Sequence, residues 1–245
     1  EPLPILLQRT PYGAAGWGES DAVPGPYREL AADGYAFAFQ DIRGTNRAEG
    51  RFLMNRPFRA TGDTAGTDEA TDAYDAVDWL VRNVPNNNGR VGIFGVSYPG
   101  WLAEAPLLYP HPALKAISPQ APMTDTWMGD DFFHQGAFRL SYGFEYAGDM
   151  ELSANSSVPL PIGSWDTYDF YLNLGSLANV ESKYFKGKVP TWTAFAAHPT
   201  YDAYWQARAV QRKLEKATVP TLTVGGWWDQ EDRWGPLATY KALER

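Results

Sequence analysis

Residues 91–100 read Val91-Gly92-Ile93-Phe94-Gly95-Val96-Ser97-Tyr98-Pro99-Gly100, and a helical pattern follows at 101–108. The apolar run 91–94 is typical of a buried strand. Glycines flank Ser97 because a Cβ at those positions would clash where the backbone turns sharply from a strand into a helix. Such a turn holds the hydroxyl away from the sheet, where a base can reach it. The stretch predicts a nucleophile elbow; the alternative is a turn in which Ser97 only caps the helix.

The composition sets limits on the class of protein. With 245 residues, 44% hydrophobic and 20% charged, the chain is long enough for one large α/β domain or a domain with an insertion. The net charge of −8 argues against nucleic acid, and no apolar run approaches the roughly 20 residues that span a bilayer. No cysteine is present, which excludes disulfides and thiolate metal sites. We therefore expect a small-molecule ligand, with no nucleic-acid or membrane partner.

Strand and helix patterns alternate around the elbow. Short apolar runs predict four further strands, at 4–8, 35–40, 114–118 and 219–224. Residues 68–83 form the clearest helix, with acidic side chains in its first turns, where the helix macrodipole favours them. Its apolar stripe consists of Ala70, Ala73, Tyr74, Val77, Leu80 and Val81. This alternation predicts a mostly parallel sheet with helices on both faces.

Residues 124–217 interrupt the alternation and are rich in aromatic, amide and acidic side chains. Three stretches in this segment have a helical pattern: 132–146, 165–174 and 201–214. We interpret the segment as a helical cap over the carboxyl edge of the sheet, where open α/β sheets bind ligands and a lid excludes water. The alternative is a separate helical domain without a role in the chemistry. The predicted organisation is a core in 1–123, a cap in 124–217 and a return to the core in 218–245.

A catalytic serine needs a base, and the base needs an acid that orients it. In α/β-hydrolases these residues follow the order serine, acid, histidine. Asp229 comes after the last predicted strand and is the best candidate for the acid. The histidines His111, His134 and His198 all precede it, and each is a poor candidate for the base. We expect the catalytic histidine beyond Arg245, so the sequence reads as the middle of a longer protein.

Several motifs occur in a fixed order along the chain. They are Arg9-Thr10-Pro11-Tyr12-Gly13, Gln40-Asp41-Ile42-Arg43-Gly44, the elbow, Gly129-Asp130-Asp131-Phe132-Phe133-His134 and Trp228-Asp229-Gln230-Glu231-Asp232. In this order they resemble the α-amino-acid ester hydrolases, relatives of cocaine esterases and X-prolyl dipeptidyl-peptidases that include members named glutaryl acylases. The resemblance extends from Pro4 to about Pro236 and implies an α/β-hydrolase fold with a helical cap.

The resemblance also implies catalytic roles. Ser97 matches the family's nucleophile and Asp229 its triad acid. The main-chain N–H of Tyr98 and the hydroxyl of Tyr12 match the oxyanion hole, and both donors suit a charge that develops only in the transition state. The alternative for Tyr12 is a turn tyrosine whose hydroxyl faces solvent.

Three further acids, Asp131, Glu231 and Asp232, match a carboxylate cluster that binds the substrate's α-ammonium in this family. Clustered carboxylates repel one another and raise their own pKa values unless a cation joins them, so a protonated amine suits such a site. The alternatives are a solvated acidic turn and a metal site. The resemblance implies neither a metal nor a cofactor.

The function implied by the resemblance is hydrolysis or acyl transfer of esters and amides of α-amino acids, including the side chains of β-lactam antibiotics such as ampicillin and cephalexin. X-prolyl dipeptidyl-peptidase and cocaine-esterase-like activities are the alternatives within the superfamily. A catalytically incomplete fragment or a binding module is the alternative outside it. Members of the family are often exported homo-oligomers, which implies a periplasmic or secreted protein, with the cytoplasm as the alternative.

Overall fold

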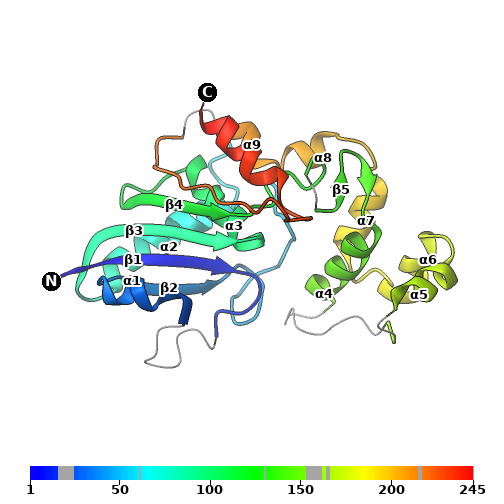
Figure 1. The fold of residues 1–245 in the computed structure, drawn as a ribbon, viewed down its shortest axis with the longest axis horizontal. Helices are drawn as coiled ribbons and strands as arrows, with labels where there is room; N and C mark the ends of the chain where they lie inside the picture. The colour runs from blue at the N-terminus through cyan, green and yellow to red at the C-terminus, as the bar shows by residue number, and fades with distance from the viewer. Residues whose placement is uncertain are drawn as a thin grey trace.

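The computed structural model describes residues 1–15, 25–60, 62–129, 131–152, 162–163, 166–214 and 217–244. At its centre lies a four-stranded sheet with the strand order β2-β1-β3-β4 (Figure 1). The strands are β1 (Leu3–Thr10), β2 (Ala36–Asp41), β3 (Asn87–Val96) and β4 (Leu114–Gln120). Every neighbouring pair is parallel, which confirms the predicted type of sheet.

The last predicted strand, at 219–224, is not a regular strand. It runs beside β4 and joins it through two isolated parallel bridges, Ile117 to Thr221 and Gln120 to Val224. Pro220 accepts a hydrogen bond from the main-chain N–H of Ile117 but has no N–H of its own to continue the ladder. The segment lies where the prediction placed it, but it does not form the regular strand that was predicted.

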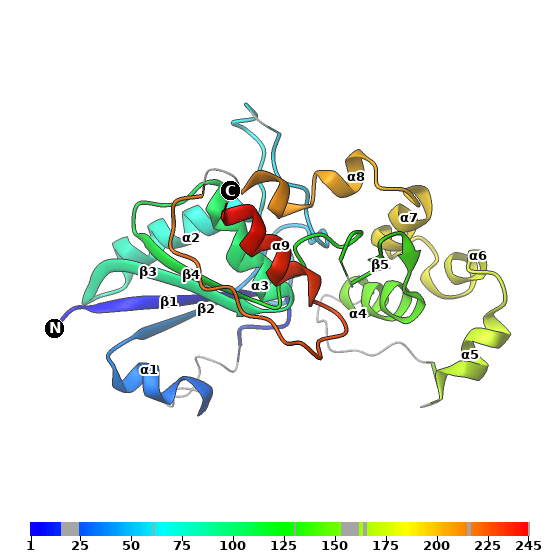
Figure 2. The same cartoon turned by 45° about the horizontal axis from the view of Figure 1, so that its top comes forward.

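Helices cover both faces of the sheet. Figure 2 shows α1 (Arg28–Ala32) on one face and α2 (Glu69–Asn83) with α3 (Tyr98–Glu104) on the other. Asp68 caps α2 through a reciprocal pair of hydrogen bonds with Thr71. Four residues of the predicted apolar stripe of α2 are buried and Val81 is partly buried, whereas Tyr74 is 38% exposed and packs edge-on against the ring of His111.

The cap residues lie beyond the carboxyl ends of the strands (Figure 1). Its short elements are β5 (Phe133–His134), β6 (Ala137–Phe138), the π-helical turn η3 (Tyr142–Tyr146), α4 (Ala147–Glu151), α5 (Thr167–Leu174), α6 (Ala178–Val180), η4 (Glu181–Phe185), α7 (Pro190–Ala197), α8 (Ala203–Gln206) and η5 (Val210–Lys213). Helix α9 (Trp234–Leu243) then packs back beside the sheet. None of the helices in the described ranges is long and apolar enough to span a membrane.

Two of the three helices predicted in the cap are interrupted in the structure. The stretch 132–146 holds the β5–β6 hairpin, whose turn residues Gln135 and Gly136 both have positive φ, before it becomes helical. The stretch 201–214 divides into α8 and η5. Helix α5 agrees with the third prediction from Thr167 onward; Trp165 is outside the described residues. The boundaries at 124 and 217 stay predictions.

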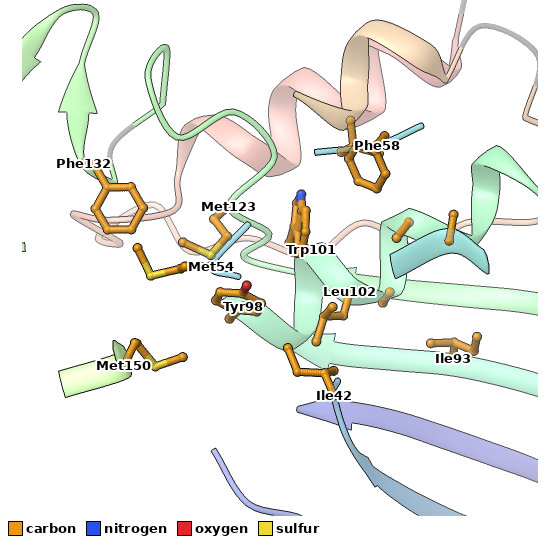
Figure 3. Close-up of a cluster of buried hydrophobic side chains, with 14 of the residues drawn as sticks. Ile42, Met54, Phe58, Ile93, Tyr98, Trp101, Leu102, Met123, Phe132 and Met150 are labelled. Atoms are coloured by element: carbon orange, nitrogen blue, oxygen red, sulfur yellow. The ribbon is translucent and has the colours of Figure 1, made fainter. Parts of the chain in front are cut away.

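The hydrophobic core continues from the sheet into the cap beneath the elbow. Tyr98 and Trp101 of α3 are fully buried, and Figure 3 shows Met54, Met123 and Phe132 around them. Burial of a large apolar side chain stabilises a fold by about 1.5–3 kcal/mol. This packing holds the first turn of α3, and with it the residue that precedes the helix, in one position.

Candidate active site

Ser97 lies at the tip of the turn between β3 and α3. Its backbone has φ 64° and ψ −125°, a combination that residues with side chains rarely adopt and that persists only where the surroundings enforce it. A Cβ added at Gly95 would collide with the main chain of Pro99, and one at Gly100 with the carbonyl oxygen of Gln120. Ser97 occupies the N-cap position of α3, but its side chain makes no capping hydrogen bond. The geometry is that of an elbow and argues against the capping alternative.

Tyr98 anchors the elbow from below. Its ring is completely buried, and its hydroxyl accepts a 2.7 Å hydrogen bond from the main-chain N–H of Asn55. As the first residue of α3, Tyr98 has a main-chain N–H that the helix itself leaves without a partner. The side chain of Tyr98 therefore packs in the core, and its main-chain N–H is available to a ligand at the elbow.

Tyr12 follows β1 and reaches the elbow from the neighbouring strand. Its hydroxyl lies 2.8 Å from the hydroxyl of Tyr146 in the cap and interacts with the side chain of Ser97. Although 45% of the residue is exposed, desolvation of the hydroxyl end raises the pKa of Tyr12 to about 12. The hydroxyl is thus protonated at neutral pH and bound within the site, unlike the solvent-facing alternative.

The three predicted cluster acids meet beside Ser97. Asp131 and Asp232 are only 6% and 4% exposed and interact with each other, and Asp232 also interacts with Ser97. Burial, followed by charge repulsion, raises the pKa of Asp131, Asp232 and Glu231. The Oδ1 atom of Asp232 is buried without a hydrogen-bond partner. The arrangement has an acceptor free for a cation and differs from a solvated acidic turn.

Asp229 shapes the turn that carries two of these acids. Its Oδ1 atom accepts hydrogen bonds from the main-chain N–H groups of Glu231, at 2.9 Å, and Asp232, at 3.0 Å. Its negative charge also contributes to the raised pKa of Asp232. The structure therefore places Asp229 next to the cluster, and its role as the triad acid stays a prediction.

Two of the three histidines lie beside acids that are not part of the candidate site. The Nε2 atom of His111 is 3.4 Å from Asp78, and the Nδ1 atom of His198 is 2.6 Å from Asp202. His134 is in β5 of the cap. The acids beside His111 and His198 are not the candidate triad acid, so the histidine expected beyond Arg245 stays a prediction.

Three residues that the sequence did not single out border the site. Tyr142 donates a hydrogen bond to the Oε1 atom of Glu231, and Tyr146 contacts Tyr12. The guanidinium of Arg139 lies 4.3 Å from the ring centre of Tyr142, and its charge lowers the pKa of the cluster acids. In the sequence these residues fall in a stretch predicted as a plain helix, where no motif marked them.

All of residues 1–245 match the sequence profile of the family described as X-Pro dipeptidyl-peptidase (S15 family). The chain belongs to this family. Within the described part of the S15 chain, no group of three or more histidine, cysteine or acidic side chains is arranged to hold a metal ion.

Three relatives show what this S15 chain is similar to. An aminopeptidase structure from the marine sediment archaeon Thaumarchaeota archaeon is 42% identical with a TM-score of 0.90, covering 98% of this chain and 41% of its own. The structure of an α-amino acid ester hydrolase labelled with selenomethionine is 38% identical with a TM-score of 0.91. The match covers 100% of this chain and 41% of the hydrolase chain. The cocaine esterase of Rhodococcus sp. (strain MB1 Bresler) is 26% identical over 241 residues. The match covers 93% of this chain and 39% of the esterase.

These comparisons confirm the suspected family and the α/β-hydrolase fold. A CocE/NonD family hydrolase from Staphylococcus aureus, 19% identical with a TM-score of 0.59, shares the fold alone. The chain spans about two fifths of the length of the relatives it matches.

Proposed function

We propose that this chain carries the acyl-transfer site of a serine hydrolase that acts on esters and amides whose acyl part has a free α-amino group. The β-lactam antibiotic side chains with such a group fall within this substrate class. Family membership and the 38% identity to an α-amino acid ester hydrolase support the class of reaction. The observation that carries the substrate class is the buried acid cluster beside Ser97.

In the proposed mechanism Ser97 attacks the carbonyl carbon and gives its proton to a histidine, which the chain order of the fold puts after Asp229. The carbonyl oxygen becomes an alkoxide between the Tyr12 hydroxyl and the Tyr98 main-chain N–H. Both donors are held by other contacts, so they need little reorganisation when the charge develops. The alkoxide then collapses, the bond to the leaving group breaks, and the histidine gives its proton to the departing alcohol or amine. Water or an amine finally takes the acyl group from Ser97.

The α-ammonium would bind between Asp131, Glu231 and Asp232. A cation there removes the repulsion that raises their pKa values, and it supplies the donor that the Oδ1 atom of Asp232 lacks. Charge-assisted hydrogen bonds of this kind contribute about 1.5–3 kcal/mol each. An acyl group without the amino group would leave the cluster uncompensated.

The test is a comparison of two phenylglycine-type esters, one with and one without the α-amino group, in the intact enzyme. We expect a higher kcat/KM for the aminated ester and a selective loss on that ester in Glu231→Gln. Equal kcat/KM values for both esters would overturn the ammonium hypothesis. An equal loss on both esters in the variant would indicate structural damage.

A second candidate is cleavage of a peptide at its amino terminus. The same acid cluster would bind the terminal ammonium, and the family profile and the 42% identity to an aminopeptidase support this activity. Proline-containing dipeptidyl substrates separate it from the first candidate. A cocaine-esterase-like activity would instead show no preference for an amino group.

A binding module without catalysis is the remaining alternative. A fluorophosphonate probe distinguishes it, because an assembled site modifies Ser97 quickly and a Ser97→Ala variant is not labelled there. Rapid labelling supports the hydrolase, and absence of labelling in the intact protein contradicts it. Export and homo-oligomerisation stay proposals from the resemblance.

A further inference from the structure

One turn of the cap contacts both halves of the proposed site. The π-helical turn η3 begins at Tyr142, whose hydroxyl binds Glu231 of the acid cluster. It ends at Tyr146, whose hydroxyl binds Tyr12 of the oxyanion hole. π-Helical turns are rare and occur frequently at functional sites. The two contacts come from opposite ends of a single turn.

The contact between Tyr146 and Tyr12 determines where the Tyr12 hydrogen can point. A hydroxyl has one hydrogen to donate, and Tyr12 must give its hydrogen to the alkoxide at the elbow. When Tyr146 donates to the Tyr12 oxygen, that hydrogen stays directed toward Ser97, and a donor that also accepts a hydrogen bond is strengthened. Burial raises the pKa of Tyr146 well above its usual range, so it keeps the hydrogen it must donate.

The turn is packed so that its two ends are held together. Phe144, in its middle, is completely buried, and a Cβ at Gly143 would collide with the ring of Phe138. The ring of Phe132, the neighbour of Asp131 in the cluster, lies 5.9 Å from the ring of Tyr146. A displacement of one end is therefore transmitted to the other.

We propose that the π-helical turn Tyr142–Tyr146 links recognition of the α-ammonium to the oxyanion hole, with Tyr142 positioning Glu231 and Tyr146 positioning Tyr12. The part of this inference that concerns Tyr142 and Glu231 rests on the proposed function, because it needs a substrate with an α-ammonium group. Binding of the ammonium to Glu231 holds the Tyr142 end of the turn, and the Tyr146 end then holds the donor that stabilises the alkoxide. Both tyrosines act through other residues and are positioning residues.

The experiment uses Tyr142→Phe, Tyr146→Phe and the double variant of the intact enzyme, with the aminated and the unaminated ester. Phenylalanine keeps the ring and removes only the hydroxyl. Tyr171→Phe is the matched control, because Tyr171 also donates a hydrogen bond to this turn, at Glu145, outside the proposed site. Thermal unfolding of each variant shows whether the fold is retained.

We expect Tyr146→Phe to lower kcat about tenfold on both esters with KM nearly unchanged, since a hydrogen bond is lost in the transition state. Tyr142→Phe should raise KM about threefold to tenfold on the aminated ester alone. On that ester the double variant should lose less than the product of the two single losses, because the residues are coupled. Tyr171→Phe should retain both parameters.

The inference is overturned if Tyr146→Phe lowers kcat no more than Tyr171→Phe does, or if the two single losses simply multiply on the aminated ester. Failure of the proposed function gives a different result. In that case the wild-type enzyme does not prefer the aminated ester, while the effect of Tyr146→Phe on the unaminated ester still tests the positioning of Tyr12.

Discussion

Buried carboxyl groups lie at both ends of helix α3, and they have opposite surroundings. At the end of the helix Glu104 is completely buried and accepts hydrogen bonds from the hydroxyls of Thr124 and Thr239. At its beginning Asp131 and Asp232 face each other beside Ser97, and one oxygen of Asp232 has no partner. An acid whose oxygens are bound within the protein serves the fold, whereas a repelling pair with a free acceptor is suited to a cationic ligand.

The difference between the two acid sites predicts the largest effect on kcat/KM for the substitution Asp131→Asn. Asparagine keeps the shape of Asp131 and can still donate to Asp232, but it removes one negative charge. Loss of a charge-assisted hydrogen bond of up to about 3 kcal/mol predicts a loss in kcat/KM of up to about a hundredfold on the aminated ester. Steady-state kinetics on the unaminated ester should change by less than about threefold, because no ammonium is bound there.

Glu104→Gln is the matched control for that substitution. It replaces an equally buried carboxyl at the other end of α3 with an amide that can bond with Thr124 and Thr239. We expect it to leave the ratio of kcat/KM for the two esters unchanged. A similar loss of selectivity in both variants would contradict the distinction between the two acid sites.

The sequence could predict the elbow and the parallel sheet, because these depend on local motifs and on chain order, whereas the members of the acid cluster came from the resemblance to a family. Glycines beside Ser97 and acids after Asp229 are recognisable as short strings. The contacts of Tyr146 and Arg139 could not be predicted in the same way. Their roles depend on the hairpin at 133–138 interrupting what looks like one continuous helix, and on cap residues meeting loops distant in the chain.

The second prediction concerns stability and pH. Burial raises the pKa of Glu104 from 4.5 to about 8, so its contribution to stability is complete below pH 4.5 and is lost as the pH rises through about 8. The free energy of unfolding should fall with pH in this window by up to about 1.4 kcal/mol per pH unit from this group. Glu104→Gln should remove that part of the slope in urea unfolding at pH 6 and pH 8. An unchanged slope would show that Glu104 is ionised in the fold.

The third prediction concerns the pH dependence of selectivity. Because the pKa values of Asp131 and Asp232 are raised, the empty cluster retains a proton at acidic pH, and the ammonium binds only after this proton leaves. The acidic limb of kcat/KM should therefore lie at higher pH for the aminated than for the unaminated ester. In Asp131→Asn the acidic limbs of the two pH profiles should fall at the same pH. Coincident limbs in the wild-type enzyme would mean that the cluster does not bind the ammonium.

The smallest effect should come from Arg139→Gln. The guanidinium lowers the pKa of the cluster acids without an ion pair to them among the described contacts, so its removal should raise these pKa values further. Removal of this charge therefore predicts a small upward shift of the acidic limb of kcat/KM on the aminated ester only. Arg208→Gln is the matched control, since Arg208 also stacks on a cap tyrosine, 3.6 Å from the ring centre of Tyr204, and does not contribute to the pKa of the cluster. A shift of equal size in both variants would mean that net charge, rather than the position of Arg139, sets the protonation of the cluster.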